Sequence, residues 1–245
     1  MSRLADACRR RGVLALAAVL LAVSMPLCAA DLQVAPTMVI IAADKGADGL
    51  TLRNSGARPL VAQVRVFAWE QNAGEDHLDP TEDLAISPAM LEIAPGAEQL
   101  VRIVRLADPP EAIERSYRVI VDEIPGPRPA SDVRMGLNFV LRYSIPVFVA
   151  PPAQTMPVLH ARLTHDGAGR VLELENVGTA HAQIADLTHA GPDGRRMIAA
   201  GLAGYVLPGR RRSWALPADA RPGPHADIQA RINGEPDVRS LLPDR

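Results

Sequence analysis

The sequence predicts an all-β fold, a sandwich or a barrel, from three observations. After residue 30, most apolar stretches are short and alternate with polar residues, which is the period of a half-buried strand. Gly, Pro, Asn or Asp residues separate these stretches at turn-forming places. Patterns typical of helices are scarce over the same range. Several short strands with turn signals between them indicate a sandwich or a barrel.

The first thirty residues are expected to be a secretory signal peptide. Three arginines, Arg9–Arg11, precede an apolar run of eleven residues, Val13–Val23, and the small residues Ala29 and Ala30 follow. The run is too short to cross a membrane comfortably, because a spanning helix takes about 20 apolar residues. Charge, a short apolar core and small residues describe a cleavable signal. We place the cleavage after Ala30.

Two variants of this signal stay open, and both concern residues that cleavage removes. The arginine run is compatible with a twin-arginine signal, and Cys28 with lipidation, although the bulky Leu27 stands before it. Cleavage after residue 30 removes Cys8 and Cys28, the two cysteines of the chain. The mature protein then has no thiol, in a compartment that would permit disulfides. This excludes a cysteine nucleophile and a thiolate metal site.

The charge of the mature chain bears on nucleic-acid binding, and its length bears on the number of domains. Residues 1–30 hold four of the 26 basic and one of the 28 acidic residues, which leaves 22 and 27 and a net charge of −5. No basic footprint for nucleic acid is visible. The 215 remaining residues suffice for one large domain or two of about 100 residues.

The order of strands and turns predicts two domains without a visible internal sequence repeat. A break at Ala150–Ala153, which contains two prolines, is interpreted as an interdomain linker between domains at 31–150 and 151–245. The expected strands before it are Gly49–Arg53, Leu60–Glu70, Leu100–Leu106, Tyr117–Glu123 and Leu137–Val149. Those after it are Leu159–Leu163, Val171–Glu175, Ala182–Leu187, Trp214–Leu216 and Ile228–Ile232.

The strand Leu137–Val149 is unusual for its length and its apolar face. Every second residue is apolar, beginning with Leu137, Phe139 and Leu141, and thirteen residues is about twice the usual length. Pro146 cannot donate to a sheet ladder, so the strand should be an edge strand at that point. Its face is either core or offered to a partner by strand addition, in which main-chain hydrogen bonds give affinity and alternate side chains fill pockets.

A search for catalytic and metal chemistry finds none. The six histidines, His77, His160, His165, His181, His189 and His225, lack zinc-protease spacing, and no nucleophile elbow, phosphate loop or dinucleotide fingerprint is present. Glu75–His77 with Asp79 is read as a turn-rich acidic loop in preference to a cation site. The cluster Arg210–Arg212 is read as a solvated loop. No enzyme and no cofactor are therefore expected.

The order of segments resembles the periplasmic pilus-assembly chaperones of chaperone–usher systems. The segments that carry this resemblance are Leu32–Pro36, Leu52–Asn54 with Leu60–Glu70, Ile93–Arg102 (an I-x-P-G-x-x-Q-x-V-R pattern), Tyr117–Pro125 (Y-R-x-x-x-x-E-I-P) and Leu137–Pro151. The resemblance implies two immunoglobulin-like β-sandwiches in a boomerang arrangement. It also implies donor-strand complementation, in which Leu137, Phe139 and Leu141 enter the open core of a pilus subunit, one to one, until an outer-membrane usher exchanges them.

The sequence departs from the family pattern at two sites. Met38 and Pro146 stand where two basic residues of the best-known branch bind the subunit's C-terminal carboxylate. Arg118 is our first candidate for a replacement anchor and Arg142 the second, with solvated strand arginines as the alternative. Glu114 stands at the acidic position of an interdomain salt bridge, but Ala150 occupies the arginine position, which puts that bridge in doubt.

The sequence features together predict a periplasmic, non-catalytic chaperone. The runs Tyr143–Phe148 and Tyr205–Gly209 resemble the archaic branch of the family most. Pilus subunits and the usher are the implied partners, without nucleic acid or a small-molecule substrate. The alternative is a secreted two-domain immunoglobulin-like adhesin or binding protein whose long strand is ordinary core.

Overall fold

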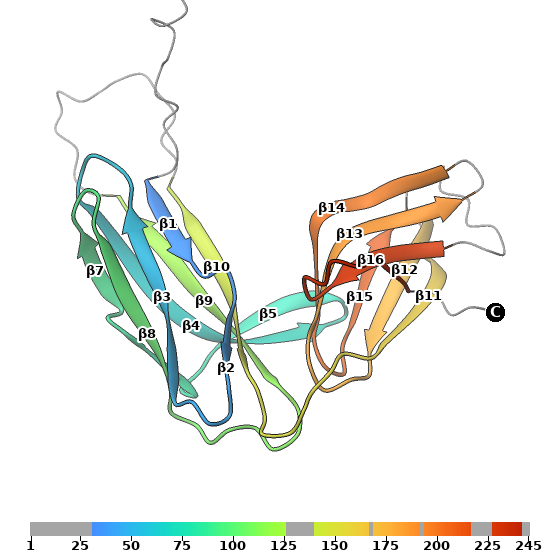
Figure 1. Cartoon of the computed structure of the whole chain (residues 1–245), viewed down its shortest axis with the longest axis horizontal. Coiled ribbons are helices and arrows are strands. Elements are labelled where there is room, and N and C mark those ends of the chain that lie inside the picture. Colours follow the sequence, from blue (N-terminus) through green and yellow to red (C-terminus); the bar gives the residue numbers. More distant parts are fainter. Residues whose placement is uncertain (1–30, 126–139, 167–168, 192–193, 217–226, 242–245) are drawn as a thin grey trace, which may run out of the picture. The chain divides into compact units, whose positions relative to one another are not determined.

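The computed structural model describes residues 31–125, 140–166, 169–191, 194–216 and 227–241 (Figure 1). Over these residues the chain forms seventeen strands and no helix. The all-β expectation is therefore confirmed. The expected signal peptide, Leu137 and Phe139 lie outside the described residues.

The strands β1 to β10 form the first sandwich (Figure 1). One sheet has the order β1-β3-β8-β6, and the other has the order β2-β10-β9-β4-β5 with β7 also paired to β4. Their bounds are β1 Leu32–Ala35, β2 Val39–Ile41, β3 Ala47–Asn54, β4 Leu60–Asn72, β5 Glu75–Pro80, β6 Leu84–Ser87, β7 Met90–Ile93, β8 Glu98–Arg105, β9 Arg115–Ile124 and β10 Arg142–Val149.

The core of the first sandwich lies between these two sheets and follows the alternation of the strands. Leu50 and Leu52 of β3 and Val119 of β9 are fully buried in one hydrophobic cluster. Ala62 and Val64 of β4 belong to the same cluster. Side chains that alternate along a strand point to opposite faces, so this inner face removes the apolar residues from water.

The strands β11 to β17 form the second sandwich. Its sheets have the orders β11-β12-β15 and β14-β13-β16-β17. Their bounds are β11 Leu159–Asp166, β12 Gly169–Asn176, β13 Ala182–Gly191, β14 Gly194–Val206, β15 Arg211–Ala215, β16 Asp227–Ile232 and β17 Arg239–Ser240. A second core, with Leu172, Leu174, Ile184 and Ile228 fully buried, lies between them.

Each expected strand is present over most of its length, but several strands were not predicted. The segment Glu75–His77 is not a loop: it begins β5, which pairs with β4 and is exposed along its whole length. An exposed strand has no apolar alternation, so its sequence does not differ from that of an acidic turn. The long strand β14 was missed because Gly201 and Gly204 interrupt its pattern, and both have positive φ.

A buried asparagine fixes a corner in the first sandwich. The side-chain amide of Asn54 donates to the carbonyls of Arg58, at 2.7 Å, and Ile93, at 2.9 Å. The backbone N–H of Asn54 donates to Ala97 O, and Gly96 N–H donates back to Asn54 O. Gly96 has a φ of 72°, which favours glycine.

The second sandwich repeats this corner contact for contact. The amide of Asn176 donates to the carbonyls of Ala180, at 2.7 Å, and Val206, at 3.0 Å. The backbone N–H of Asn176 donates to Arg210 O, and Gly209 N–H donates to Asn176 O. Gly209 has a φ of 68°.

The two corners are a structural repeat in a chain without a visible internal sequence repeat. In both, an N-x-G turn leaves one strand, a P-G turn enters another, and the asparagine amide joins them. The repeat is invisible in the sequence because only these short motifs are shared. It shows that the two sandwiches are built on one plan.

Candidate functional site

The strand β10 has two parts that differ in their partners. It pairs with β9 along its whole length, from Arg142 to Val149, but with β2 only from Val147 onward. Pro146 therefore lies in the part with an open edge, as predicted. The backbone pairing with β9 continues to Leu141, whose carbonyl accepts a hydrogen bond from Glu123 N–H.

The apolar face of this strand begins in the core of the sandwich and leads out of it. Ile145, Val147 and Val149 are buried members of the core, whereas Tyr143 and Leu141 are partly buried and pack against it. The Tyr143 hydroxyl donates to Leu32 O at 2.5 Å. The structure thus places Leu141 at the border of the core, and Leu137 and Phe139 precede it outside the described residues.

The opposite face of the same sheet carries the two candidate arginines. Arg142 is already paired: its Nε donates to Asp122 Oδ1, and Arg65 Nη2 donates to Asp122 Oδ2 at 2.6 Å. These contacts lower the pKa of Asp122, first through the Arg142 hydrogen bond and then through Arg65. Because it is already paired with Asp122, Arg142 is the weaker candidate anchor.

Arg118 of β9 has a different setting, on aromatic faces instead of a carboxylate. Its Cζ lies 3.6 Å from the centroid of Trp69 and 5.4 Å from that of Tyr205. Its Nη1 donates to Ser144 O at 3.4 Å. Over the described ranges no carboxylate lies within ion-pair distance of Arg118.

Burial affects the pKa of Arg118. Removal of the guanidinium from water lowers the pKa of Arg118, and Asp76 and Tyr205 act in the opposite direction. An arginine nevertheless stays protonated in a protein. The side chain is therefore a partly desolvated cation without a counter-ion among the described residues, a costly arrangement that an anion would relieve.

The two positions where the sequence departs from the family pattern lie beside this arginine. Pro146 is the cross-strand partner of Arg118 in β10. Met38 packs against the cluster of Trp69, Phe148, Tyr205 and Leu207. Apolar residues thus stand at both positions, and Arg118 is the basic residue on the strand next to Pro146.

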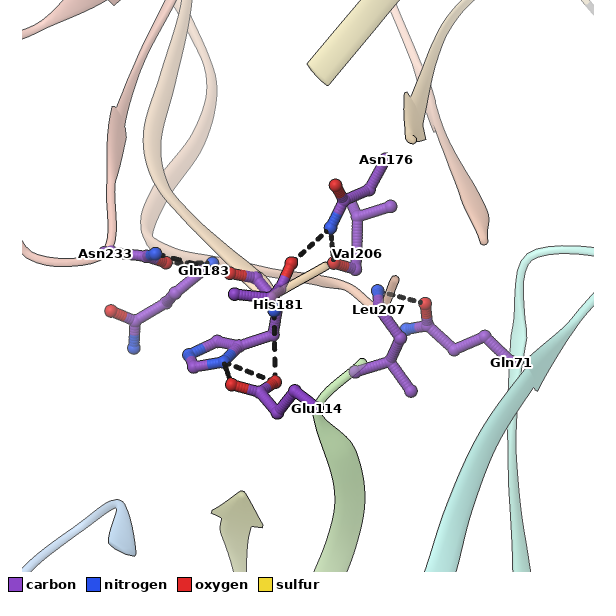
Figure 2. A network of polar contacts seen from close by, with 9 residues as sticks. Gln71, Glu114, Asn176, His181, Gln183, Val206, Leu207 and Asn233 are labelled. Carbon is purple, nitrogen blue, oxygen red and sulfur yellow. Dashed lines mark hydrogen bonds and ion pairs between the residues drawn. The ribbon is translucent and has the colours of Figure 1, made fainter. Parts of the chain in front are cut away.

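Glu114 binds a partner that the sequence did not suggest. The backbone N–H of His181 donates to Glu114 Oε1 at 3.1 Å, and His181 Nδ1 lies 2.9 Å from the same oxygen (Figure 2). Both side chains are buried. The His181 ring stacks on Phe148 at 3.5 Å between centroids and 1° between planes. A histidine from the second sandwich thus holds Glu114 in place of the arginine that Ala150 does not provide.

A second polar contact between the sandwiches comes from Gln71 at the end of β4. Its Nε2 donates to Tyr205 O at 2.9 Å. Its Oε1 accepts from Leu207 N–H at 3.0 Å (Figure 2). Asn176 supports the segments that make these contacts, because its amide binds the carbonyl of Ala180, next to His181, and that of Val206, between Tyr205 and Leu207. Neither Gln71 nor His181 was foreseen, since a lone sequence does not say which distant residues meet.

The basic cluster Arg210–Arg212 is not the loop that was expected, because Arg211 and Arg212 lie in β15, although Arg211 is solvent-exposed. Arg211 is in β15 and donates to Glu175 at 2.9 Å. Arg210 lies 3.7 Å from Glu70, and Arg212 lies 3.4 Å from Asp76. Each arginine therefore has a carboxylate neighbour, which Arg118 lacks, although the charge of Arg212 acts on Arg118 and helps to lower its pKa.

Two further kinds of feature concern metal binding and membrane crossing. Within the described ranges no group of three or more His, Cys, Asp or Glu residues is placed to hold a metal ion. No described segment forms a helix of the length and hydropathy that a membrane crossing requires.

Solved structures show what this fold resembles. The chaperone–tip adhesion subunit pre-assembly complex CsuC–CsuE from the archaic chaperone–usher Csu pili of Acinetobacter baumannii contains a chain with a TM-score of 0.67 and 23% identity, covering 86% of this chain and 97% of that one. The Salmonella enterica SafA pilin–SafB chaperone complex gives 0.65 and 20%, covering 86% and 95%. The E. coli chaperone DraB gives 0.58 and 19%, covering 82% and 90%.

Sequence comparison assigns the family. No curated protein sequence matches the chain. The family model described as pili and flagellar-assembly chaperone, PapD N-terminal domain, matches residues 31–155, which is half of the chain. The chain therefore belongs to the pili and flagellar-assembly chaperone family.

Proposed function

We propose that this protein is a periplasmic chaperone that completes a pilus subunit by lending it the start of the long strand, and then delivers the subunit to an outer-membrane usher. The observation that carries the proposal is the position of Leu141, which is only partly buried at the border of the core and follows Leu137 and Phe139 in the apolar alternation of the sequence. Leu137, Phe139 and Leu141 are the lent residues. The CsuC and SafB structures, each of a chaperone with its subunit, support this function.

The mechanism is strand addition followed by exchange. Three large apolar side chains contribute about 5–9 kcal/mol when a subunit buries them, before the cost of association is subtracted. The main chain of the lent segment supplies hydrogen bonds that do not depend on the subunit's sequence. Such a complex is stable and can still be displaced by a better-fitting strand from the next subunit. The chemistry requires no nucleotide and no catalytic residue.

Arg118 is proposed as the anchor for the subunit's C-terminal carboxylate. A guanidinium takes a carboxylate through two parallel, charge-assisted hydrogen bonds. Arg118 has no carboxylate of the described residues within ion-pair distance, whereas Arg142 is bound to Asp122. The anchor would fix the register in which the subunit meets the lent strand.

Periplasmic co-expression with the pilin-like secreted protein encoded beside this chain tests the proposal. The native protein should purify as a one-to-one complex, and a variant with Leu137, Phe139 and Leu141 changed to Ser or Thr should lose the subunit and keep its circular dichroism spectrum and melting temperature. Arg118→Gln should weaken capture while folding normally.

The control is made on the same face of the same strand. Changing Ile145 and Val147 to Thr should unfold the protein, because both are buried in its own core. If the triple variant unfolds in the same way, or if the native protein captures no subunit, the strand is ordinary core. The adhesin or binding-protein interpretation would then replace the chaperone.

A further inference from the structure

We propose that Tyr205, a residue of the second sandwich, is a positioning residue for the Arg118 anchor, so that carboxylate capture requires both sandwiches. This inference rests on the proposed function of Arg118. It deepens that function by assigning a role to a residue outside the strands that contact the subunit.

First, Tyr205 is one of two aromatic rings that contact the Arg118 guanidinium, and Trp69 is the other. Trp69 and Tyr205 meet edge to face, with centroids 5.5 Å apart and planes at 82°. Both rings are almost fully buried, and Arg118 Cζ lies within cation–π distance of each. The rings limit the rotamers of a long side chain that would otherwise move freely.

The second step is that Tyr205 is itself held in place by hydrogen bonds. Gln183 Nε2 donates to the Tyr205 hydroxyl at 3.0 Å. Gln71 holds the backbone of the same segment through Tyr205 O and Leu207 N–H. The ring therefore has a fixed position relative to Trp69, which lies two residues before Gln71 on the same face of β4.

The third step concerns the acidic group that would compete for the anchor. Asp76 favours the charged form of Arg118 through space. Its carboxylate is occupied, because Oδ1 accepts from Gln71 Nε2 at 2.9 Å and lies 3.4 Å from Arg212 Nη1. Arg118 is left without an ion pair, on a rigid aromatic support, and this is the preorganised state that binds a carboxylate with little reordering.

The test uses acetate as the carboxylate probe and acetamide as its neutral isostere. Nuclear magnetic resonance of the Arg118 Nε–H group follows a titration at constant ionic strength with the purified protein. Acetate should shift this resonance saturably in the native protein, and acetamide should not. Tyr205→Leu should bind acetate about tenfold more weakly, whereas Tyr205→Phe, which keeps the ring, should bind it as the native protein does.

Two controls separate positioning from general damage. Arg142→Gln should leave the acetate response unchanged, and the melting temperature of every variant is measured. If Tyr205→Leu does not fold, Gln71→Met decides, because it keeps all the rings and removes the amide that holds the Tyr205 segment. The variant is made in an Asp76→Asn background and compared with Asp76→Asn alone, because the same amide also binds Asp76. It should also weaken acetate binding.

The outcomes distinguish this inference from the function on which it rests. If acetate leaves the Arg118 Nε–H resonance of the native protein unchanged, or shifts it no more than acetamide does, Arg118 is not an anchor and that part of the proposed function fails. If the native protein responds specifically, but Tyr205→Leu and Gln71→Met bind acetate as tightly, only the role of Tyr205 is overturned.

Discussion

Single buried asparagines organise each sandwich, and the physical reason lies in the backbone groups that they satisfy. Both residues are fully buried. Asn54 binds two carbonyls from separate segments and accepts from Gly56 N–H at 2.9 Å, and Asn176 does the same with Gly178 N–H at 3.0 Å. A carbonyl left unpaired in the interior costs free energy of about 1–3 kcal/mol, so neither side chain has a simple replacement.

Replacing either asparagine with alanine should be severe. Asn54→Ala and Asn176→Ala each remove a buried amide that donates to two carbonyls, so each should reduce the free energy of unfolding by about 3 kcal/mol. Denaturant unfolding measures the loss, with Asn72→Ala as the exposed control. A loss below about 1 kcal/mol at either position would show that water or a backbone shift replaces the amide.

At the scale of elements, sequence patterns predicted the strands that have one apolar face and missed those that have none. β4 and β9 carry clear alternation and were found, whereas β5 is exposed throughout and was taken for a loop. In the candidate site, Arg118 and Arg142 were nominated from their positions on strands. Their difference was not predictable, because it depends on Asp122, Trp69 and Tyr205, which reach them from other segments.

The outer face of the β4-β9-β10 region is tied together by one carboxylate, and this predicts a pH dependence. The Arg142 and Arg65 contacts lower the pKa of Asp122 below its unfolded value of about 3.9. A depressed pKa means that this stability is fully present above that unfolded value and is lost as the pH falls through the folded value. The contacts of Asp122 with Arg142 and Arg65 should therefore stabilise the protein at neutral pH and not in acid.

Asp122→Asn tests this expectation. At pH 7 the variant should be less stable than the native protein by about 1 kcal/mol, since both arginines are substantially exposed and solvent screens the pairs. Denaturant unfolding at several pH values should show the difference shrinking below about pH 4. A difference that stays constant down to pH 2.5 would mean that packing, not charge, accounts for the effect.

For the whole molecule, the decisive feature is that buried, specific polar contacts join the sandwiches beside their shared aromatic cluster. Gln71 binds two backbone groups of the second sandwich, and Glu114 binds two groups of His181 (Figure 2). Buried polar contacts contribute little net stability compared with apolar packing, but they are costly when misaligned. They therefore favour one arrangement of the two sandwiches, which is what an anchor built from Arg118 and Tyr205 requires.

A double-mutant cycle on Glu114 and His181 measures this coupling. Because the pair is buried and one partner is a carboxylate, Glu114→Gln, His181→Ala and the double variant should give a coupling free energy of about 1.5–3 kcal/mol in denaturant unfolding. A matched cycle on Glu123 and His160, which lie in different sandwiches and share no contact among the described residues, should be additive within about 0.5 kcal/mol. If the Glu114–His181 cycle is additive as well, the pair does not couple the sandwiches. The Gln71 contacts and the aromatic cluster of Trp69, Phe148, Tyr205 and Leu207 would then have to hold them together.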